Sequence, residues 1–258
     1  MGETEAARPY FTHRRKDWVP RQLHEDLRVS SHAALEGVGR QLCPGCGFSR
    51  ALYCHTCLRA LTAAPSVALP FNLWVLTHVQ QNEATATGVH LAVLGAPRVT
   101  LLPVGELPTL NKATTVVLFP DSCALPAEEV EPDSVTDVIV VDSKWGQTNG
   151  IVQSAALQGV RHVRLGRYRT SYWRYHTRGV PEDGLCTVEA VYFLCRELHT
   201  KAHPHGECHC FDDLLWYFAH QHRTVHLVSA ARNEAKLQLT AGAAPPRADK
   251  DGPSEYPQ

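Results

Sequence analysis

The unbroken apolar run Val138–Val141 is the feature that most constrains how this chain folds. Branched side chains without polar alternation predict a strand covered on both faces, as in parallel sheets packed between helices. Ligands of such sheets bind beyond the carboxyl ends of the strands. The residues that follow, Asp142-Ser143-Lys144-Trp145, therefore predict a site at this exit. The alternative is that Asp142 or Ser143 only caps a helix over residues 145–157.

Other apolar patterns extend this fold along the chain. Helical spacing predicts a helix over Val188–Leu198 with Thr187 as its N-cap, and another around Leu214–Ala219. Alternating strands and helices predict an α/β fold with a mainly parallel sheet. The further strands are expected at Phe71–Thr77, Val99–Leu102, Thr115–Phe119 and Val160–Leu165.

Length and composition limit the class of protein. The chain has 258 residues, of which 44% are hydrophobic, enough for the core of one large domain or two modest ones. It has no apolar run of about 18 residues, and residues 1–6 lack a secretory core and a myristoylation hydroxyl. We therefore expect an intracellular protein without a membrane partner. The formal net charge of −1 means that a polyanion must be bound by a local patch.

Four segments are expected along the chain. Residues 1–36 lack sustained periodicity and are predicted to be a flexible N-terminal arm. Residues 37–62 form a small metal module, and residues 63–228 form the α/β domain. Residues 229–258 are predicted to be a flexible tail, since their end is rich in Ala, Pro, Gly and charge.

Two C-x-x-C pairs predict a structural zinc site. Nine cysteines in a reducing compartment favour metal ligation over disulfides where they cluster. Cys43 and Cys46 form one pair, Cys54 and Cys57 form the other, and four thiolates complete the tetrahedral shell of Zn²⁺. The seven residues between the pairs predict one tight hairpin that depends on metal for its stability. A redox C-x-x-C motif is the alternative.

A second stretch rich in metal-ligand types spans His203–Cys210. Adjacent ligands in a loop with Pro and Gly more often lie exposed than converge, so the sequence leaves a second metal open. The isolated Cys123, Cys186 and Cys195 are expected to be small buried residues.

A basic segment at residues 161–178 predicts contacts with RNA. Arginine binds phosphates and aromatic rings stack on unpaired bases, and this segment has both and no acid. The alternative is a solvated strand and loop whose aromatic residues pack on the core. The arginines are Arg161, Arg164, Arg167, Arg169, Arg174 and Arg178, with Tyr168, Tyr172, Trp173 and Tyr175 among them.

Several separated motifs resemble the DTW-domain family of tRNA-uridine aminocarboxypropyltransferases. The family is named for an Asp-x-Thr-Trp motif, which reads Asp142-Ser143-Lys144-Trp145 here. The resemblance covers about residues 40–225, including the four clustered cysteines. Lys144 replaces the motif threonine, and Cys186 replaces a serine. The other matching motifs are Leu76–His78 with Glu83, Thr87–His90, Val117–Pro120 and Leu185–Ala190.

The resemblance implies a fold and a reaction. The fold would be SPOUT-like, with a C-terminal trefoil knot that holds S-adenosylmethionine. The reaction would transfer the 3-amino-3-carboxypropyl group of that co-substrate to N3 of a tRNA uridine. Residues 172–176 and 189–193 look most like one animal branch, which points to position 20 of the D-loop. The nucleus is favoured over the cytosol, no DNA partner is expected, and the oligomeric state stays open.

The resemblance also implies roles for individual residues. Asp142 would accept the N3 proton or orient the uracil. Trp145 would offer a stacking face, its alternative being a buried core indole. A zinc-containing RNA-binding scaffold without turnover and a SPOUT-type RNA methyltransferase are the alternative functions. Cofactor contacts would come from Phe119, Pro120, Asp121, Leu185, Thr187 and Glu189.

Overall fold

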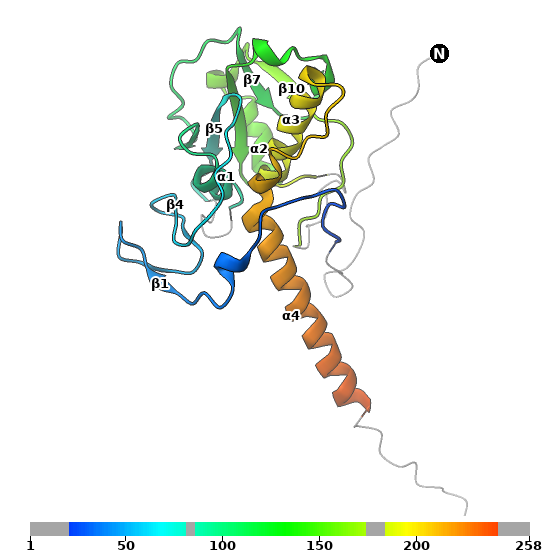
Figure 1. Cartoon of the computed structure of the whole chain (residues 1–258). Coiled ribbons are helices and arrows are strands. Elements are labelled where there is room, and N and C mark those ends of the chain that lie inside the picture. Colours follow the sequence, from blue (N-terminus) through cyan, green and yellow to red (C-terminus); the bar gives the residue numbers. More distant parts are fainter. Residues whose placement is uncertain (1–20, 81–85, 174–183, 242–258) are drawn as a thin grey trace, which may run out of the picture.

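The computed structural model describes residues 21–80, 86–173 and 184–241. Figure 1 shows a central sheet with helices packed against it, a cysteine-rich module beside it and a long helix, α4, that leads away from it. The predicted apolar run is strand β9 (Asp137–Asp142), which lies inside this sheet. The α/β class predicted from the sequence is therefore confirmed.

The main sheet has six strands in the order β6-β5-β9-β7-β10-β8. Every neighbouring pair runs parallel. Strand β8 has no counterpart among the predicted strands, because two residues are too few to carry a pattern. The strands beside β9 are β5 (Asn72–Thr77), β6 (Val99–Pro103), β7 (Thr115–Leu118), β8 (Leu125–Pro126) and β10 (Arg161–Arg164).

Strand β9 is covered on both faces, as its composition predicts. Val138 and Val140 pack in one core cluster with helix α3 (Thr187–Ala202) and helix α1 (Gly88–Leu94). Ile139 packs in a second cluster with helix α2 (Trp145–Val152). Each fully buried aliphatic side chain stabilises the fold by about 1.5–3 kcal/mol. A polar residue at any of these positions would face a core, which explains the absence of polar alternation.

The helix starts differ from the predictions. Helix α3 begins at Thr187, and its N-cap is Cys186 rather than Thr187. The Cys186 sulfur accepts from the backbone N–H of Glu189, and the Glu189 carboxylate accepts from the N–H of Cys186. Helix α2 ends at Val152, and its N-cap, Lys144, makes no side-chain bond to it. The residue at the N-cap position of α2 is therefore Lys144, rather than Asp142 or Ser143.

Short 3₁₀ turns join these elements. One of them, Ala155–Leu157, stands where the sequence predicts the end of the helix over 145–157. The others are Ala33–Leu35, Ala127–Glu129, Pro132–Ser134 and Asp212–Leu215.

Residues 21–32 form an N-terminal strap across α3 and α4. Leu23 and Leu27 pack against the main core, and the backbone N–H of Arg28 donates to Asp212 Oδ2 at 2.6 Å. Figure 1 shows the strap in dark blue, passing near the start of α4. The prediction of a flexible arm over 1–36 is therefore wrong for residues 21–36, because individual polar contacts hold a segment that has no periodic pattern.

Helix α4 (Trp216–Ala241) is longer than predicted. Its first turn is buried, with Trp216, Tyr217 and Phe218 inside the fold, whereas Leu227 is exposed. The helix continues through residues 229–241, which belong to the segment predicted to be a flexible tail. In the part of the chain that the structure describes, no helix is both long and apolar enough to cross a membrane.

The cysteine-rich module consists of two small antiparallel hairpins rather than the single hairpin predicted. Strands β1 (Gln41–Leu42) and β2 (Ser49–Arg50) form the first, and β3 (Tyr53–Cys54) and β4 (Arg59–Ala60) form the second.

Tyr53 fastens this module to the helices. Its hydroxyl hydrogen-bonds His90 Nε2 on α1 at 3.0 Å and accepts from Gln221 Nε2 on α4 at 3.2 Å. Burial lowers the pKa of His90 to about 3, so this imidazole is neutral. The module is therefore docked on the α/β domain through a neutral polar contact.

Candidate functional site

Three chain segments meet at the carboxyl edge of the sheet. Strand β9 ends there with Asp142, whose Oδ2 accepts from the backbone N–H of Gly88, the first residue of α1, at 2.7 Å. Thr87, just before α1, accepts through Oγ1 from the N–H of Val188 in the first turn of α3 at 3.4 Å. One strand end and two helix starts are thus joined by side-chain contacts at the edge where parallel sheets bind ligands.

The Asp142 carboxylate caps the start of α1. Only 3% of the residue is exposed, and its carboxylate lies at the N-terminus of α1, where the helix dipole favours an anion. Glycine is required at position 88. A Cβ there would collide with Asp142 Oδ2 and lie 2.9 Å from Cγ1 of Val75.

The other motif residues line the start of α2. Ser143 Oγ hydrogen-bonds Thr148 Oγ1 at 2.9 Å, and Lys144 is exposed. Trp145 is the first residue of α2, and its side chain lies outside the described residues. A ligand at this edge would therefore meet an exposed cation where the family motif has a threonine.

The turn after β7 offers mostly backbone to a ligand. Phe119 packs in the α2-side core and donates its N–H to Val163 O at 2.9 Å. Pro120 is exposed. The Asp121 carboxylate pairs with His162 Nδ1 and accepts from the N–H of Cys123 at 2.9 Å. The Asp121 carboxylate is thus already engaged, which leaves the backbone of Asp121 for the predicted cofactor contact.

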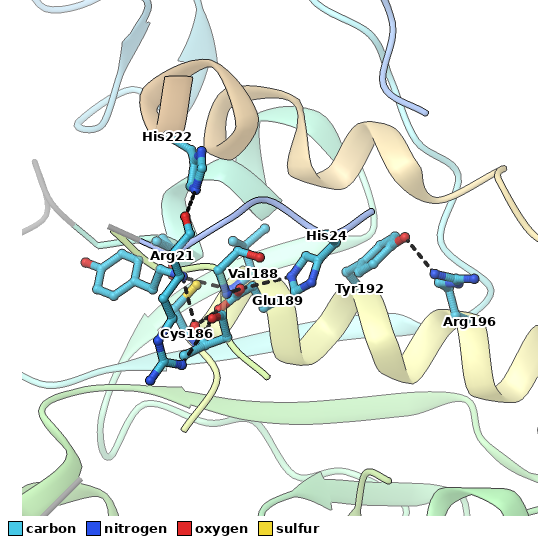
Figure 2. A network of polar contacts seen from close by, with 12 residues as sticks. Arg21, His24, Cys186, Val188, Glu189, Tyr192, Arg196 and His222 are labelled. Carbon is cyan, nitrogen blue, oxygen red and sulfur yellow. Dashed lines mark hydrogen bonds and ion pairs between the residues drawn. The ribbon is translucent and has the colours of Figure 1, made fainter. Parts of the chain in front are cut away.

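Glu189 lies at the centre of a buried polar network. It has 0% exposure. One carboxylate oxygen bonds His24 Nε2 at 3.1 Å and accepts from the N–H of Ser171 at 2.6 Å. The other accepts from Thr170 Oγ1 at 2.6 Å and from the N–H of Cys186 at 3.0 Å. Figure 2 shows His24 of the strap reaching Glu189 from the side opposite Cys186.

These contacts define what Glu189 does in the structure. Burial raises the pKa of its carboxyl, but bonds and charge from His24, Thr170 and Cys186 outweigh burial and hold that pKa below its ordinary value. An ionised carboxylate with four donors has no free position for a cofactor, so the expected contact through Glu189 is not supported. The C-x-x-E spacing of Cys186 and Glu189 is the signal that sequence reasoning missed, since a capping box has this spacing.

The other residues at the start of α3 are half-buried. Leu185 packs against the main core, and Thr187 occupies the first position of the helix. Burial and Glu189 raise the pKa of the Cys186 thiol well above its ordinary value, so Cys186 caps the helix as a neutral group.

The predicted RNA-binding arginines are only partly exposed. Arg164, Arg167 and Arg169 are exposed, whereas Arg161 is half-buried and donates to Ala113 O at 3.1 Å. Arg164 Nε also donates to Ala124 O at 3.2 Å. Arg174 and Arg178 lie outside the described residues.

The aromatic residues between these arginines pack on the core. Tyr168 stacks on Phe193 with ring centroids 3.8 Å apart. Trp173 is 9% exposed and belongs to the main core, against which Tyr172 also packs. The contacts of these three rings match the alternative reading, in which the aromatic residues pack on the core. Tyr175 lies outside the described residues.

A cavity of about 1230 Å³ lies between the strap, the loop after β10 and α3. Arg21, Arg169, Arg196 and Lys201 line it together with acidic residues of the strap and of α3. This mixture of charges does not favour an anion. The cavity is lined by neither Asp142 nor Thr187, so it is distinct from the carboxyl edge.

The four clustered cysteines converge as the sequence predicts. The sulfurs of Cys43, Cys46, Cys54 and Cys57 all lie within 4.8 Å of one another, and those of Cys46 and Cys54 are 3.5 Å apart. The N–H groups of Gly45 and Cys57 donate to the sulfurs of Cys43 and Cys54, each at 3.4 Å. A Cβ on Gly45 would lie 2.9 Å from the Cys57 sulfur, so the loop is closely fitted to the cluster.

The four thiols influence one another's ionisation. Burial opposes ionisation of Cys54, but hydrogen bonds from the Cys57 N–H and from the neighbouring thiols lower its pKa to about 6. A hydrogen bond with Cys46 raises the pKa of Cys57 to about 12. Four thiolates repel one another at this spacing, and a divalent cation removes that repulsion. The donor set is the one that structural zinc prefers.

The cysteines elsewhere differ in their exposure. Cys195 is fully buried, as predicted, whereas Cys123 is exposed, contrary to prediction. In the stretch His203–Cys210, Cys208 and Cys210 converge with His199 of α3, all within 4.8 Å. Sequence reasoning missed His199, because it precedes the stretch and sits on a helix.

Comparison with known proteins places most of the chain in one group. The family model described as the DTW domain matches residues 40–226. A Xenopus laevis protein named tRNA-uridine aminocarboxypropyltransferase 1 is 29% identical over 266 residues, which cover 83% of this chain and 90% of that protein. The Homo sapiens protein of the same name is 22% identical and is covered over 88% of its length, with 84% of this chain.

One solved structure also matches. It is titled the SAM-dependent rRNA:acp-transferase Tsr3 from Vulcanisaeta distributa, with 13% identity over 58% of this chain and 80% of that chain. Its TM-score of 0.33 is too low to establish a shared fold. The matched family segment contains the cysteine cluster, Asp142 and the start of α3.

Proposed function

The chain belongs to the DTW-domain family, and on this premise we propose that it is a transferase that moves the 3-amino-3-carboxypropyl group of S-adenosylmethionine to a uridine of tRNA. The observation that carries the proposal is the junction of Asp142, Gly88 and Thr87 at the carboxyl edge of the sheet. The relatives that bear this activity in their names are covered over about nine-tenths of their length, for example 90% of the Xenopus laevis protein.

The residues at this edge suit an activated co-substrate. When bound, S-adenosylmethionine supplies a sulfonium carbon that is already activated for transfer. The chain then needs to orient its ligands and remove one proton. Thr187, at the first position of α3, would offer a donor to the carboxylate of the transferred group. The proposed contacts are Phe119, Pro120, the backbone of Asp121, Leu185 and Thr187, without Glu189.

Asp142 is proposed as a positioning residue at this site. Its carboxylate holds the first turn of α1 against β9. This contact would fix the position of the backbone on which a uridine would lie. We propose N3 of a D-loop uridine, at position 20, as the acceptor. Trp145 would form a wall for the base, and the exposed Lys144 would reach a tRNA phosphate.

Zinc and the knot are further parts of the proposal. Cys43, Cys46, Cys54 and Cys57 would hold a structural zinc ion, since their four sulfurs converge and form the donor set of such sites. The module would then be a rigid unit docked on α1 through Tyr53 and His90. We also propose a SPOUT-like trefoil knot and a nuclear location, both on resemblance alone.

A double-label experiment tests the reaction. The full chain is incubated with unmodified tRNA and S-adenosylmethionine that carries separate labels in its methyl and carboxyl carbons. We expect carboxyl label on uridine and none from the methyl. Methyl label on RNA would indicate the methyltransferase alternative. Retained tRNA binding without either label would indicate the scaffold alternative, and both results contradict the proposal.

The exposed arginines after β10 are proposed to contact tRNA phosphates. We expect the double change Arg167→Ala and Arg169→Ala to weaken tRNA binding about tenfold and to reduce the slope of log K against log salt by about one for each phosphate that is no longer neutralised. Arg232→Ala on the exposed part of α4 is the matched control and should leave both unchanged. Binding titrations at several salt concentrations measure these quantities. An unaltered salt slope in the double variant would remove this surface from the proposal.

A further inference from the structure

A second group of metal-ligand side chains lies at the far end of α3 from the carboxyl edge. His199, in the last turn of α3, lies with Cys208 and Cys210 so that one ligand atom of each is within 4.8 Å of the others. The two cysteines belong to the loop that joins α3 to the 3₁₀ turn Asp212–Leu215. We name these three residues the α3-loop cluster.

The spacing of the cluster fits a tetrahedral ion. Two thiolates on one Zn²⁺, each at about 2.3 Å, stand about 3.8 Å apart. The sulfurs of Cys208 and Cys210 are 3.7 Å apart, far longer than a disulfide bond of about 2.0 Å. Cys208 is buried, whereas Cys210 is exposed, so an ion has a route from solvent and a place for a water ligand.

The imidazole of the cluster lacks a competing partner. Within the described residues, the buried Nδ1 atom of His199 has no hydrogen-bond partner. Buried polar atoms without a partner are rare in proteins, and a bound ion is one established reason for them.

Other ligand types nearby are engaged elsewhere. His203 stacks on His199 with ring centroids 4.4 Å apart, and its Nδ1 bonds the backbone O of His199 at 3.2 Å. His209 bonds Asp212 Oδ2 through Nδ1 at 2.9 Å. The cluster therefore has three protein ligands among the described residues, and water would complete the shell.

We propose that the α3-loop cluster binds a second zinc ion through His199, Cys208 and Cys210. Two thiolates with one imidazole are a donor set that zinc prefers to magnesium or calcium. The ion would fasten the loop to the end of α3. This proposal does not depend on the proposed transfer reaction.

The position of the ion gives it a structural consequence. Asp212 follows Cys210 by two residues and is 1% exposed. Its carboxylate accepts from Tyr192 Oη of α3 at 3.0 Å and from the N–H of Arg28 in the strap at 2.6 Å. Fixing the loop would therefore also fix the residue on which the strap is held.

Zinc counting tests the proposal on the full chain. The protein is loaded with zinc, dialysed, and analysed for metal and protein. We expect two zinc ions per chain in the wild type and one after Cys208→Ser or Cys210→Ser. The matched control Cys123→Ser should retain two, since that exposed thiol lies outside both clusters. Cys57→Ser, which removes a ligand of the four-cysteine cluster, should also retain one zinc ion. The two kinds of variant therefore each remove a different ion.

A cobalt titration tests the proposal without the Cys57→Ser variant, so the result does not depend on whether that variant folds. Wild-type protein should bind two equivalents of Co²⁺ with thiolate charge-transfer absorption, and Cys210→Ser only one. One equivalent of metal in the wild type, unchanged by Cys210→Ser, would overturn the proposal. So would a disulfide between Cys208 and Cys210 in freshly purified protein, which thiol titration and a mass lower by two hydrogens would reveal.

Discussion

Replacing Glu189 by alanine is expected to lower the free energy of unfolding by about 3–5 kcal/mol, the cost of breaking a buried charged network. The carboxylate has 0% exposure and bonds groups from three separate segments, His24 of the strap, Thr170 and Ser171 after β10, and Cys186 before α3. Removing it leaves buried donors unpaired and opens a cavity. Urea unfolding followed by circular dichroism measures the change.

Two further variants define the origin of this effect. Glu234→Ala, on the exposed end of α4, should change stability by no more than about 0.5 kcal/mol. Glu189→Gln keeps one acceptor oxygen and places an amide N–H₂ against donors, so an intermediate loss is expected. If Glu189→Ala lowered the free energy of unfolding by less than about 1 kcal/mol, the network would not be what joins the strap to α3.

The pH dependence of stability follows from the same group. The folded-state pKa of Glu189 lies below the ordinary value of 4.5, so its ionised form is the one that the fold stabilises. This contribution is fully present above the unfolded pKa and is lost as the pH falls through the folded pKa. We expect the wild-type protein to lose stability below about pH 4.5, and Glu189→Gln to lose less over that range.

Periodic features of the fold could be predicted from the sequence. Val138–Val141 has no polar alternation because its side chains face two cores, one on the α3 side and one on the α2 side. The sheet follows from repeated runs of this kind. The two C-x-x-C pairs were predictable for a similar reason, since their short spacing already brings the thiolates together.

Contacts between distant single residues could not be predicted in the same way. Asp142 caps the helix that starts at Gly88, and a cap is usually sought in the residues directly before its helix. The strap has no amphipathic pattern, and single contacts such as Arg28 with Asp212 hold it in place. His199 joins Cys208 only because the chain turns back after α3. Each of these contacts depends on tertiary packing.

Asp142→Asn is expected to lower kcat for aminocarboxypropyl transfer less than about tenfold, whereas Asp142→Ala should lower it about 100-fold or more. Asparagine keeps an oxygen for the N–H of Gly88, although a charge-assisted bond is about twice as strong as a neutral one. A general base contributes about 10²–10⁴-fold to the rate. Measured kcat, KM and pH–rate profiles separate these roles. A loss above about 100-fold in Asp142→Asn, with the fold intact and a changed profile, would make Asp142 the base instead.

Gly88→Ala attacks the same contact from the other side. Its Cβ would overlap Asp142 Oδ2 and push the start of α1 away from β9, so we expect a loss of kcat similar to that of Asp142→Ala. Gly150→Ala in α2 is the matched control, because a Cβ there meets nothing within 4 Å. Residues that act through one contact show non-additive effects. The double variant Gly88→Ala with Asp142→Ala should therefore lose little more than either single variant, whereas multiplied losses would show that the two residues serve the reaction independently.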